Sequence, residues 1–259
     1  MTALYILIPV ALLILLYLFL ICPSSGKKAE AFDGKFIAHR GLHGGDIKEN
    51  TLPAFKKAVE KGYGVELDIH LSKDKIPVVN HDNTLERVFG VDKRVKDLTA
   101  SDLNKIGVPT LAQVLEVLDG KVLLVAEIKG EDVSTEVCEK AAELLDRYNG
   151  VFCVESFNPM HTRWFKKNRP SFVRGQLSTV FKKEKSFGKK ARNLFLKNLL
   201  LNVFSRPHFI AYEHKYYPLS VRLCILLGAH PVCWTTRSKE ESDKASRHYK
   251  TFIFEGYEP

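Results

Sequence analysis

The sequence has few cysteines, and no two of them form a Cys-x-x-Cys pair. Five widely spaced cysteines exclude the dense disulfide framework of a small secreted domain, and they disfavour a cysteine zinc site. The 259 residues contain no low-complexity tract and no obvious repeat. Hydrophobic residues make up 45% and charged residues 27%, which is typical of a folded chain and excludes a disordered or polytopic membrane protein.

Charge is entirely absent from residues 1–23, which also lack histidine. The run from Ala3 to Cys22 would make a helix of about 30 Å, the thickness of the hydrocarbon core of a bilayer. A secretory signal normally has a basic start and a shorter apolar stretch, whereas here no basic residue precedes the run and the run is too long. We therefore expect residues 1–23 to be an uncleaved transmembrane anchor and residues 24–34 a linker, with a buried helix or an unusual signal as alternatives.

The basic residues that flank this run lie on its C-terminal side: Lys27, Lys28, Lys35 and Arg40. Under the positive-inside rule, this asymmetry predicts a single-pass membrane protein whose C-terminal domain lies on the cytoplasmic side.

Residues 35–259 are close in number to the roughly 250 residues of a (β/α)8 barrel. Short apolar segments alternate with amphipathic ones, which predicts a parallel sheet, closed or open, with helices between the strands. Local signals agree, such as the Thr110-x-x-Gln113 capping box at a helix start. We expect strands at Lys35–Ala38, Gly64–His70, Ile76–Asn80, Val122–Ile128, Val151–Phe157, Phe172–Leu177, Phe209–Glu213 and Pro231–Thr235, with Phe252–Phe254 a further short strand-like stretch.

Polar residues gather where these strands end. Glu66 and Asp68 share one face of a strand at a spacing of about 6–7 Å, so that both carboxylates could grip one hard cation. A salt-bridged pair is the alternative, because unpaired buried acids are costly. His39-Arg40, His81-Asp82 and Glu127-Ile128-Lys129 follow or end other strands. Because catalytic residues of α/β barrels lie at the C-terminal ends of the strands, these clusters predict a single site there.

An ordered set of short motifs resembles the glycerophosphodiester phosphodiesterase family over residues 35–259. The motifs are His39-Arg40-Gly41, Glu49-Asn50-Thr51, Ala54-Phe55, Glu66-Leu67-Asp68, Val78-Val79-Asn80-His81-Asp82, Pro109-Thr110-Leu111, Glu127-Ile128-Lys129, Ser156-Phe157 and Trp234-Thr235. The sequence departs from the family pattern over residues 178–206 and after Ile253, which affects the expected substrate choice more than the chemistry.

The resemblance implies a TIM barrel that hydrolyses glycerophosphodiesters with a divalent cation. By position, His39 and His81 match the acid/base pair, and Glu66, Asp68 and Glu127 match the metal ligands. Arg40 and Lys129 match residues near the phosphate, and Trp234 an aromatic at the glycerol end of the pocket. Glu49 and Asp82 are expected to support these groups. An all-oxygen ligand set suits Mg²⁺ or Ca²⁺, or Mn²⁺, better than Zn²⁺.

Residues 178–206 form a basic amphipathic insert in the predicted barrel. Eight lysines and arginines accompany many leucines and phenylalanines between Phe181 and Arg206. Such a segment is typical of a helix on an anionic membrane surface, although an ordinary outer barrel helix has a similar composition. A net charge of +9 could also indicate a nucleic-acid partner, but the sequence contains no nucleic-acid-binding motif, so none is expected.

Three functions fit this sequence. The first is hydrolysis of glycerophosphodiesters to glycerol 3-phosphate and an alcohol at a membrane-anchored site. The second is lysophospholipase D-like hydrolysis of lysophospholipids, which the anchor and the insert favour. The third is a non-catalytic barrel that binds lipid headgroups, and the presence of both histidines and all three acids argues against it. The sequence indicates no oligomeric state.

Overall fold

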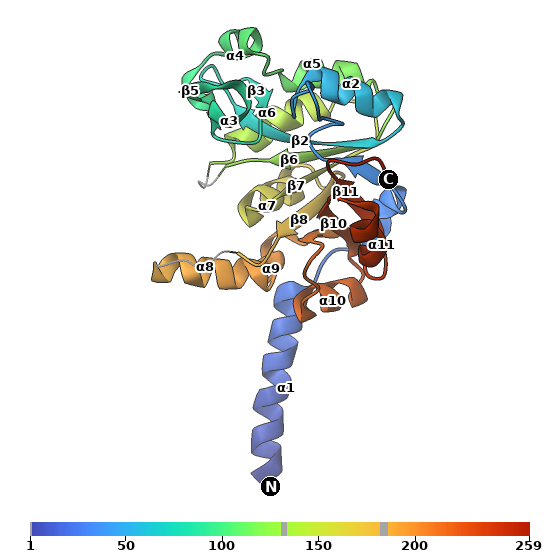
Figure 1. The fold of residues 1–259 in the computed structure, drawn as a ribbon. Helices are drawn as coiled ribbons and strands as arrows, with labels where there is room; N and C mark the ends of the chain where they lie inside the picture. Colours follow the sequence, from blue (N-terminus) through green and yellow to red (C-terminus); the bar gives the residue numbers. More distant parts are fainter. Residues whose placement is uncertain (1, 131–133, 182–185) are drawn as a thin grey trace.

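Eight parallel strands close into a barrel in the computed structural model, which describes residues 2–130, 134–181 and 186–259 (Figure 1). The predicted TIM barrel is therefore confirmed. β1 closes the barrel because it pairs with β11 on one side and with β2 on the other. In spatial order the strands are β1 (Phe36–Ala38), β11 (Thr251–Phe254), β10 (His230–Thr236), β9 (Phe209–Glu213), β8 (Val173–Ser178), β7 (Phe152–Ser156), β6 (Leu124–Ile128) and β2 (Gly64–Leu71).

One predicted barrel strand lies outside the barrel. β3 (Pro77–Val79) runs antiparallel to β2, and the short C-terminal stretch that forms β11 takes the eighth place. The physical reason is the length of the connection. Residues 72–76 suffice for a hairpin turn, whereas a crossover to a parallel strand needs about a dozen residues or more.

Helices cover the outside of the strands through their apolar faces. Several begin where the sequence places a cap: Thr110 and Gln113 form the predicted capping box at α5, and Asn158 accepts a hydrogen bond from the backbone N–H of Met160 at α7. The outer helices are α2 (Leu52–Glu60), α5 (Leu111–Leu118), α6 (Glu136–Leu145), α7 (Pro159–Asn168), α10 (Leu219–Leu226) and α11 (Lys239–Ala245).

Small elements between β3 and α5 form a separate cluster beside the barrel. Their side chains pack around Leu85 and Leu103, which are fully buried. These elements are β4 (Thr84–Leu85), α3 (Glu86–Phe89), β5 (Val91–Arg94), η2 (Val95–Asp97) and α4 (Ala100–Ile106).

The segment expected to be a linker is a packed part of the barrel. Residues of the 3-10 helix η1 (Gly26–Phe32) fill one end of the barrel interior, where Ala29 and Phe32 pack with apolar residues of the strands. Gly26 lies so close to the chain at Gly228 that an added Cβ would come within 2.5 Å of the Gly228 carbonyl oxygen. Residues 24–34 therefore set the position of whatever precedes them.

Helix α1 (Thr2–Ile21) projects away from the barrel, with most of its apolar side chains exposed (Figure 1). Within the described residues, no single helix has the length and hydropathy of a membrane span. Tyr5–Ile21 and Gly26–Phe32 meet that criterion only as a pair, with a bend of 46° between them.

Two further helices follow β8, in the region predicted to be a basic amphipathic insert. They are α8 (Phe187–Lys197) and α9 (Asn202–Ser205). No residue of α8 is buried, whereas the outer barrel helices all bury apolar side chains. Figure 1 shows α8 extending sideways from the barrel, crosswise to α1.

Candidate active site

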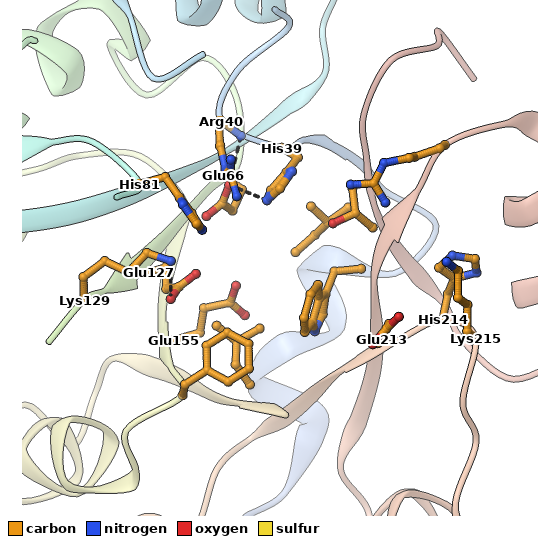
Figure 2. Close-up of a pocket in the computed structure, with 16 residues that line it drawn as sticks. His39, Arg40, Glu66, His81, Glu127, Lys129, Glu155, Glu213, His214 and Lys215 are labelled. Carbon is orange, nitrogen blue, oxygen red and sulfur yellow. Dashed lines mark hydrogen bonds and ion pairs between the residues drawn. The ribbon is translucent and has the colours of Figure 1, made fainter. Parts of the chain in front are cut away.

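A cavity of about 160 Å³ opens at the C-terminal ends of the barrel strands (Figure 2). Its walls carry most of the residues that the sequence predicts for catalysis. They are His39, Arg40, Glu66, His81, Glu127, Lys129 and Trp234. Asp68 completes the set behind Glu66 and Glu127, fully buried on β2.

Three carboxylates meet at the floor of this cavity. Glu66 and Asp68 alternate along β2, and Asp68 stands opposite Glu127 in the pairing of β2 with β6. One oxygen from each lies within 4.8 Å of the others, and all three side chains are buried. Such a converging set of oxygens matches the ligands that Mg²⁺ or Ca²⁺ prefers.

The negative charges of these three acids repel one another. Burial, together with the negative charges of Asp68 and Glu127, raises the pKa of Glu66 well above its usual value. Burial also raises the pKa of Glu127 to about 7, although Lys129 opposes this shift. Three buried acids in mutual repulsion fit a site built for a cation, because a divalent ion would relieve both burial and repulsion.

Two basic side chains border the carboxylates. Lys129 Nζ lies 2.7 Å from both Asp68 Oδ1 and Glu127 Oε1. Despite burial, Lys129 and His81 hold the pKa of Asp68 well below its usual range. Arg40 pairs with Glu49 at 2.8 Å, and its backbone N–H donates to Glu66 Oε2 at 2.9 Å. Both basic residues therefore contact the carboxylates that the sequence predicts as metal ligands.

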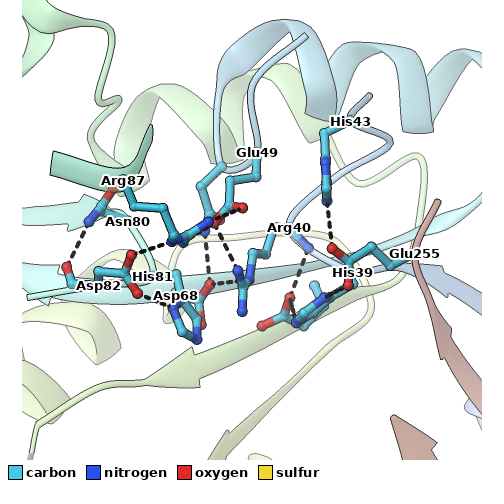
Figure 3. Close-up of polar contacts among 12 residues, drawn as sticks. His39, Arg40, His43, Glu49, Asp68, Asn80, His81, Asp82, Arg87 and Glu255 are labelled. Atoms are coloured by element: carbon cyan, nitrogen blue, oxygen red, sulfur yellow. Dashed lines mark hydrogen bonds and ion pairs between the residues drawn. The ribbon is translucent and has the colours of Figure 1, made fainter. Parts of the chain in front are cut away.

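His39 is held by a carboxylate that sequence reasoning missed. The Nδ1 atom of His39 lies 3.2 Å from Glu255 Oε2, just beyond the end of β11 (Figure 3). The hydrogen bond from His39 lowers the pKa of Glu255 to about 2, and burial lowers the pKa of His39. An ionised Glu255 accepts a hydrogen bond from Nδ1–H, which leaves Nε2 as the atom of His39 that can exchange a proton with substrate.

His81 has a matching support on the other side of the cavity. Its Nδ1 atom lies 2.6 Å from Asp82 Oδ1, and Arg87 Nε donates to Asp82 Oδ2 at 2.6 Å. Arg87 also donates two hydrogen bonds to Glu49, which in turn accepts one from Arg40 (Figure 3). Glu49 and Asp82 thus link His81 to Arg40 through Arg87, a residue that the sequence analysis did not single out.

The antiparallel course of β3 explains how His81 reaches the cavity. β2 continues to Leu71, and β3 returns along it, so that Val79 pairs with Ile69. The backbone N–H of Asn80 then donates to the Asp68 carbonyl at 3.0 Å. His81 arrives beside the carboxylates from a hairpin and not, as expected, from the end of a parallel barrel strand.

Trp234 and Phe157 form an aromatic part of the cavity wall. Trp234 on β10 packs edge-on against Phe157, and its indole N–H donates to the Ala211 carbonyl at 3.2 Å. Glu155 on β7 also faces the cavity, as Figure 2 shows, and burial raises its pKa well above the usual value. Its place near the end of the predicted strand Val151–Phe157, on the face opposite to Val154, could have marked it as an inward-facing acid.

A larger groove of about 560 Å³ adjoins the cavity and shares His81, Glu127 and Lys129 with it. Its far wall is formed by Phe181 and by residues of α8 and the turn after it. The apolar residues of this wall are Phe181, Leu196 and Leu201, with Arg192 as a cation at its edge, and Phe157 and Pro159 line the groove on the side of β7 and α7.

A family model and the curated relatives of this chain indicate the same family. The sequence model of the Glycerophosphoryl diester phosphodiesterase family matches residues 39–249. A glycerophosphodiester phosphodiesterase of Caldanaerobacter subterraneus subsp. tengcongensis is 36% identical over 159 residues, which cover 54% of this chain and 65% of the relative. A human lysophospholipase D is 34% identical over 140 residues, covering 48% and 44%. The chain thus aligns with less than two thirds of the length of either relative.

Solved structures share the fold over nearly the whole chain. A phosphodiesterase of Oleispira antarctica, in complex with the product sn-glycerol-3-phosphate, has a TM-score of 0.70 at 22% identity, covering 88% of this chain and 94% of that one. A glycerophosphodiester phosphodiesterase of Thermotoga maritima has a TM-score of 0.66 at 26% identity, covering 85% and 93%.

Proposed function

The chain belongs to the glycerophosphoryl diester phosphodiesterase family, and on that premise we propose that it hydrolyses glycerophosphodiesters to glycerol 3-phosphate and an alcohol. The observation that carries the proposal is the meeting of three buried carboxylates with two supported histidines in one cavity. A non-catalytic barrel would have no need of acids that repel one another inside its core.

Glu66, Asp68 and Glu127 would hold one divalent cation, Mg²⁺ or Ca²⁺, or Mn²⁺. When bound, the ion supplies a Lewis acid for a phosphoryl oxygen. Arg40 offers two N–H groups to the phosphate, and Lys129 adds a positive charge nearby. Together these residues would place the phosphorus atom between His39 and His81.

The two histidines would then transfer the protons. One accepts a proton at Nε2 from the attacking hydroxyl as its oxygen bonds to phosphorus. The other donates a proton from Nε2 to the leaving alkoxide as the second P–O bond breaks. Each transfer is typically worth about 10²–10⁴ in rate. The attacking hydroxyl belongs either to water or to the glycerol moiety, and the latter would give a cyclic phosphate first.

A release assay tests this function. The chelated full chain would be supplied with glycerophosphocholine, and Mg²⁺, Ca²⁺ or Mn²⁺ would be restored one at a time. We expect ion-dependent release of choline that is lost in His39→Ala and His81→Ala. Release that persists after chelation would contradict the metal, and full activity of both variants would contradict the histidine pair. A silent, folded protein would point to a binding barrel.

We also propose that α1 anchors the chain in a membrane, with the barrel on the cytoplasmic side. Support comes from its composition: no residue from Thr2 to Ile21 is charged, and the basic residues follow it. Protease treatment of sealed vesicles of known orientation tests the topology. In right-side-out vesicles a cytoplasmic barrel is enclosed and should be protected from added protease. Digestion of the barrel in these vesicles would contradict the proposed topology.

Lysophospholipids are the second candidate substrates. The specific observation that favours them is the apolar groove beside the catalytic cavity, which has room for a chain that glycerophosphocholine lacks. Hydrolysis of lysophosphatidylcholine to lysophosphatidic acid and choline tests this alternative in the same assay. A much higher kcat/KM for glycerophosphocholine would contradict it.

A further inference from the structure

Helix α8 leaves its apolar face uncovered. Phe187, Ala191, Leu194 and Phe195 follow the spacing of one helical face, which in a barrel helix would pack on the strands. Here Phe187 is 86% exposed and Leu194 59% exposed. Leu196, on the opposite side of the helix, lines the groove that joins the catalytic cavity. The helix therefore separates the groove from an apolar surface that no described part of the chain covers.

A second apolar surface lies on α10, on the other side of α1. Leu226 is 81% exposed and Leu219 61% exposed, at the two ends of this helix. Both α9 and α10 contact α1, and Figure 1 shows α8 and α10 at the end of the barrel from which α1 projects. The exposed apolar side chains of α8 and α10 thus flank the base of the long apolar helix.

The base of α1 is fixed to the barrel by polar contacts. Arg206 Nη1 donates to the carbonyl oxygens of Phe19 and Cys22, at 2.8 and 2.7 Å, and its guanidinium lies over the Phe19 ring. Asn202 Nδ2 donates to the Ile21 carbonyl at 3.1 Å. These bonds occupy carbonyls at the C-terminal end of α1 that would otherwise lack helical partners. The direction of α1 therefore sets the orientation of the barrel.

The charge of this region matches an anionic surface. Residues 186–206 contain no aspartate or glutamate. Their five basic residues are Lys189, Lys190, Arg192, Lys197 and Arg206. Basic side chains around bulky apolar ones are the composition of helices that lie in the interface of membranes with anionic lipids.

We propose that α8, α9 and α10 form a seating surface around α1 that rests on an anionic lipid leaflet, with the groove behind α8 receiving the acyl chain of a one-chain glycerophosphodiester. The inference rests on the proposed phosphodiesterase function, and it commits the site to a substrate drawn from the lipid surface. Phe181, Leu196 and Leu201 would hold the chain, and Arg192 would lie at the headgroup level. The phosphate would meet His81 and Lys129, which the groove and the cavity share.

The contact with lipid can be measured without reference to activity. Tryptophan would be introduced in the full chain as Phe187→Trp, Leu226→Trp or, as a control on the far side of the barrel, Ile76→Trp, since Ile76 is also exposed, at 42%. The chains would be reconstituted in phosphatidylcholine–phosphatidylglycerol vesicles with or without bromine on the acyl chains. Emission of the unsubstituted chain, which contains two tryptophans, is subtracted.

We expect the bromine to quench the tryptophans at 187 and 226 about twofold or more and to leave the one at 76 unchanged, since the apolar face of an interfacial helix lies about 5–10 Å deep. Equal quenching at all three positions would overturn the seating surface. The seating surface would also be overturned if the side chain at position 187 became shielded from solvent only when the chain dimerised in detergent. A second copy of the chain, and not lipid, would then cover the apolar face of α8.

A double variant, Phe187→Ser with Leu194→Ser, links the surface to substrate. We expect about tenfold slower hydrolysis of lysophosphatidylcholine in vesicles and unchanged hydrolysis of glycerophosphocholine in solution, since two apolar side chains leave the lipid contact. Equal losses on both substrates would overturn the link. If the unsubstituted chain hydrolysed neither substrate, the proposed phosphodiesterase function would fail, while the bromine quenching would still decide the seating surface.

Discussion

The two halves of this barrel differ in where their charged and apolar side chains lie. β1, β2 and β6 bring buried acids and basic side chains into the barrel mouth, and their helices bury apolar faces normally. β8, β9 and β10 contribute the apolar interior residues Leu177, Ala211 and Val232, while the helices beside them expose leucine and phenylalanine. One half thus gathers buried carboxylates around Lys129 and Arg40, and the other leaves apolar groups that no described residue covers. The two halves therefore suit different kinds of external ligand.

The largest effect is expected from Glu66→Gln, which removes one of the three repelling charges. Loss of a metal ligand should lower kcat by about 10³-fold or more. Because burial and the charges of Asp68 and Glu127 raise the pKa of Glu66, its ionisation is unfavourable in the folded chain, and the metal-free variant should be more stable at pH 8. Steady-state rates and urea unfolding measure the two effects.

The matched control for this change is Glu143→Gln, which alters an exposed acid on α6 paired with Lys140. It should change neither the rate nor the stability by more than about 0.5 kcal/mol. Added Mg²⁺ or Ca²⁺ should stabilise the unsubstituted chain and not Glu66→Gln. A metal-free variant that is both inactive and markedly less stable would show that Glu66 is a structural acid.

Glu255→Gln should have the next largest effect, because it weakens the support of His39 without touching the carboxylates. We expect kcat to fall by about 10–100-fold with little change in KM, as for other groups that orient a reacting imidazole. Glu255→Asp should recover part of the rate, and Glu258→Gln is the control, since Glu258 pairs with exposed Lys61. An unchanged pH–rate profile and kcat in Glu255→Gln would remove Glu255 from the site.

His208 gives the second half a pH dependence that is independent of catalysis. It is buried, its Nδ1 accepts the backbone N–H of Arg174 at 3.2 Å, and burial with the nearby Arg174 and Lys28 charges lowers its pKa to about 4. As the pH falls below 6.5, the unfolded chain takes up a proton first, so stability is full above pH 6.5 and is lost towards pH 4. At pH 5 the loss should be about 2 kcal/mol.

Urea unfolding of the unsubstituted chain and of His208→Gln at pH 7.5 and pH 5 isolates this contribution. The variant should lose about 2 kcal/mol less between the two values, whatever its stability at pH 7.5. Parallel pH dependences in the two chains would mean that His208 titrates normally in the folded state.

The smallest effect is expected from Arg206→Ala, which frees the base of α1. Two hydrogen bonds from one guanidinium to helix carbonyls are worth about 1–2 kcal/mol in the folded chain. Hydrogen exchange of the amides near Cys22 should become faster, while hydrolysis of glycerophosphocholine should not change. Lys105→Ala, far from α1 and exposed, is the control. Equal exchange in both variants would show that other contacts fix α1.

The sequence predicted the carboxylates of the site well, because strict alternation on β2 places Glu66 and Asp68 on the inner face of a strand whatever its neighbours are. It also predicted eight barrel strands, but it gave one of the eight places to residues 76–80 and named Phe252–Phe254 only as a further strand-like stretch. The five-residue connection 72–76 makes β3 a hairpin partner of β2, and β11 takes the eighth place. His81 was expected at the end of a parallel barrel strand, whereas the hairpin of β2 and β3 brings it to the site.

Glu255 and Arg87 escaped the sequence analysis because their importance depends on contacts across long distances in the chain. Glu255 is 216 residues from His39, and Arg87 is 38 residues from Glu49. Nothing in the local pattern of either segment distinguishes them from exposed surface charges. Only closure of the barrel, which pairs β1 with β11, brings Glu255 next to His39.

Local sequence by itself determined the apolar α1, the helix caps, the inward acids of β2 and the basic character of residues 186–206, since each depends on neighbours within about one helical turn or strand pair. The tertiary structure alone decided that Glu255 supports His39, that η1 fills one end of the barrel, and that no described residue covers the apolar face of α8. Packing settles these features, because burial and pairing depend on which distant segments compete for the same space.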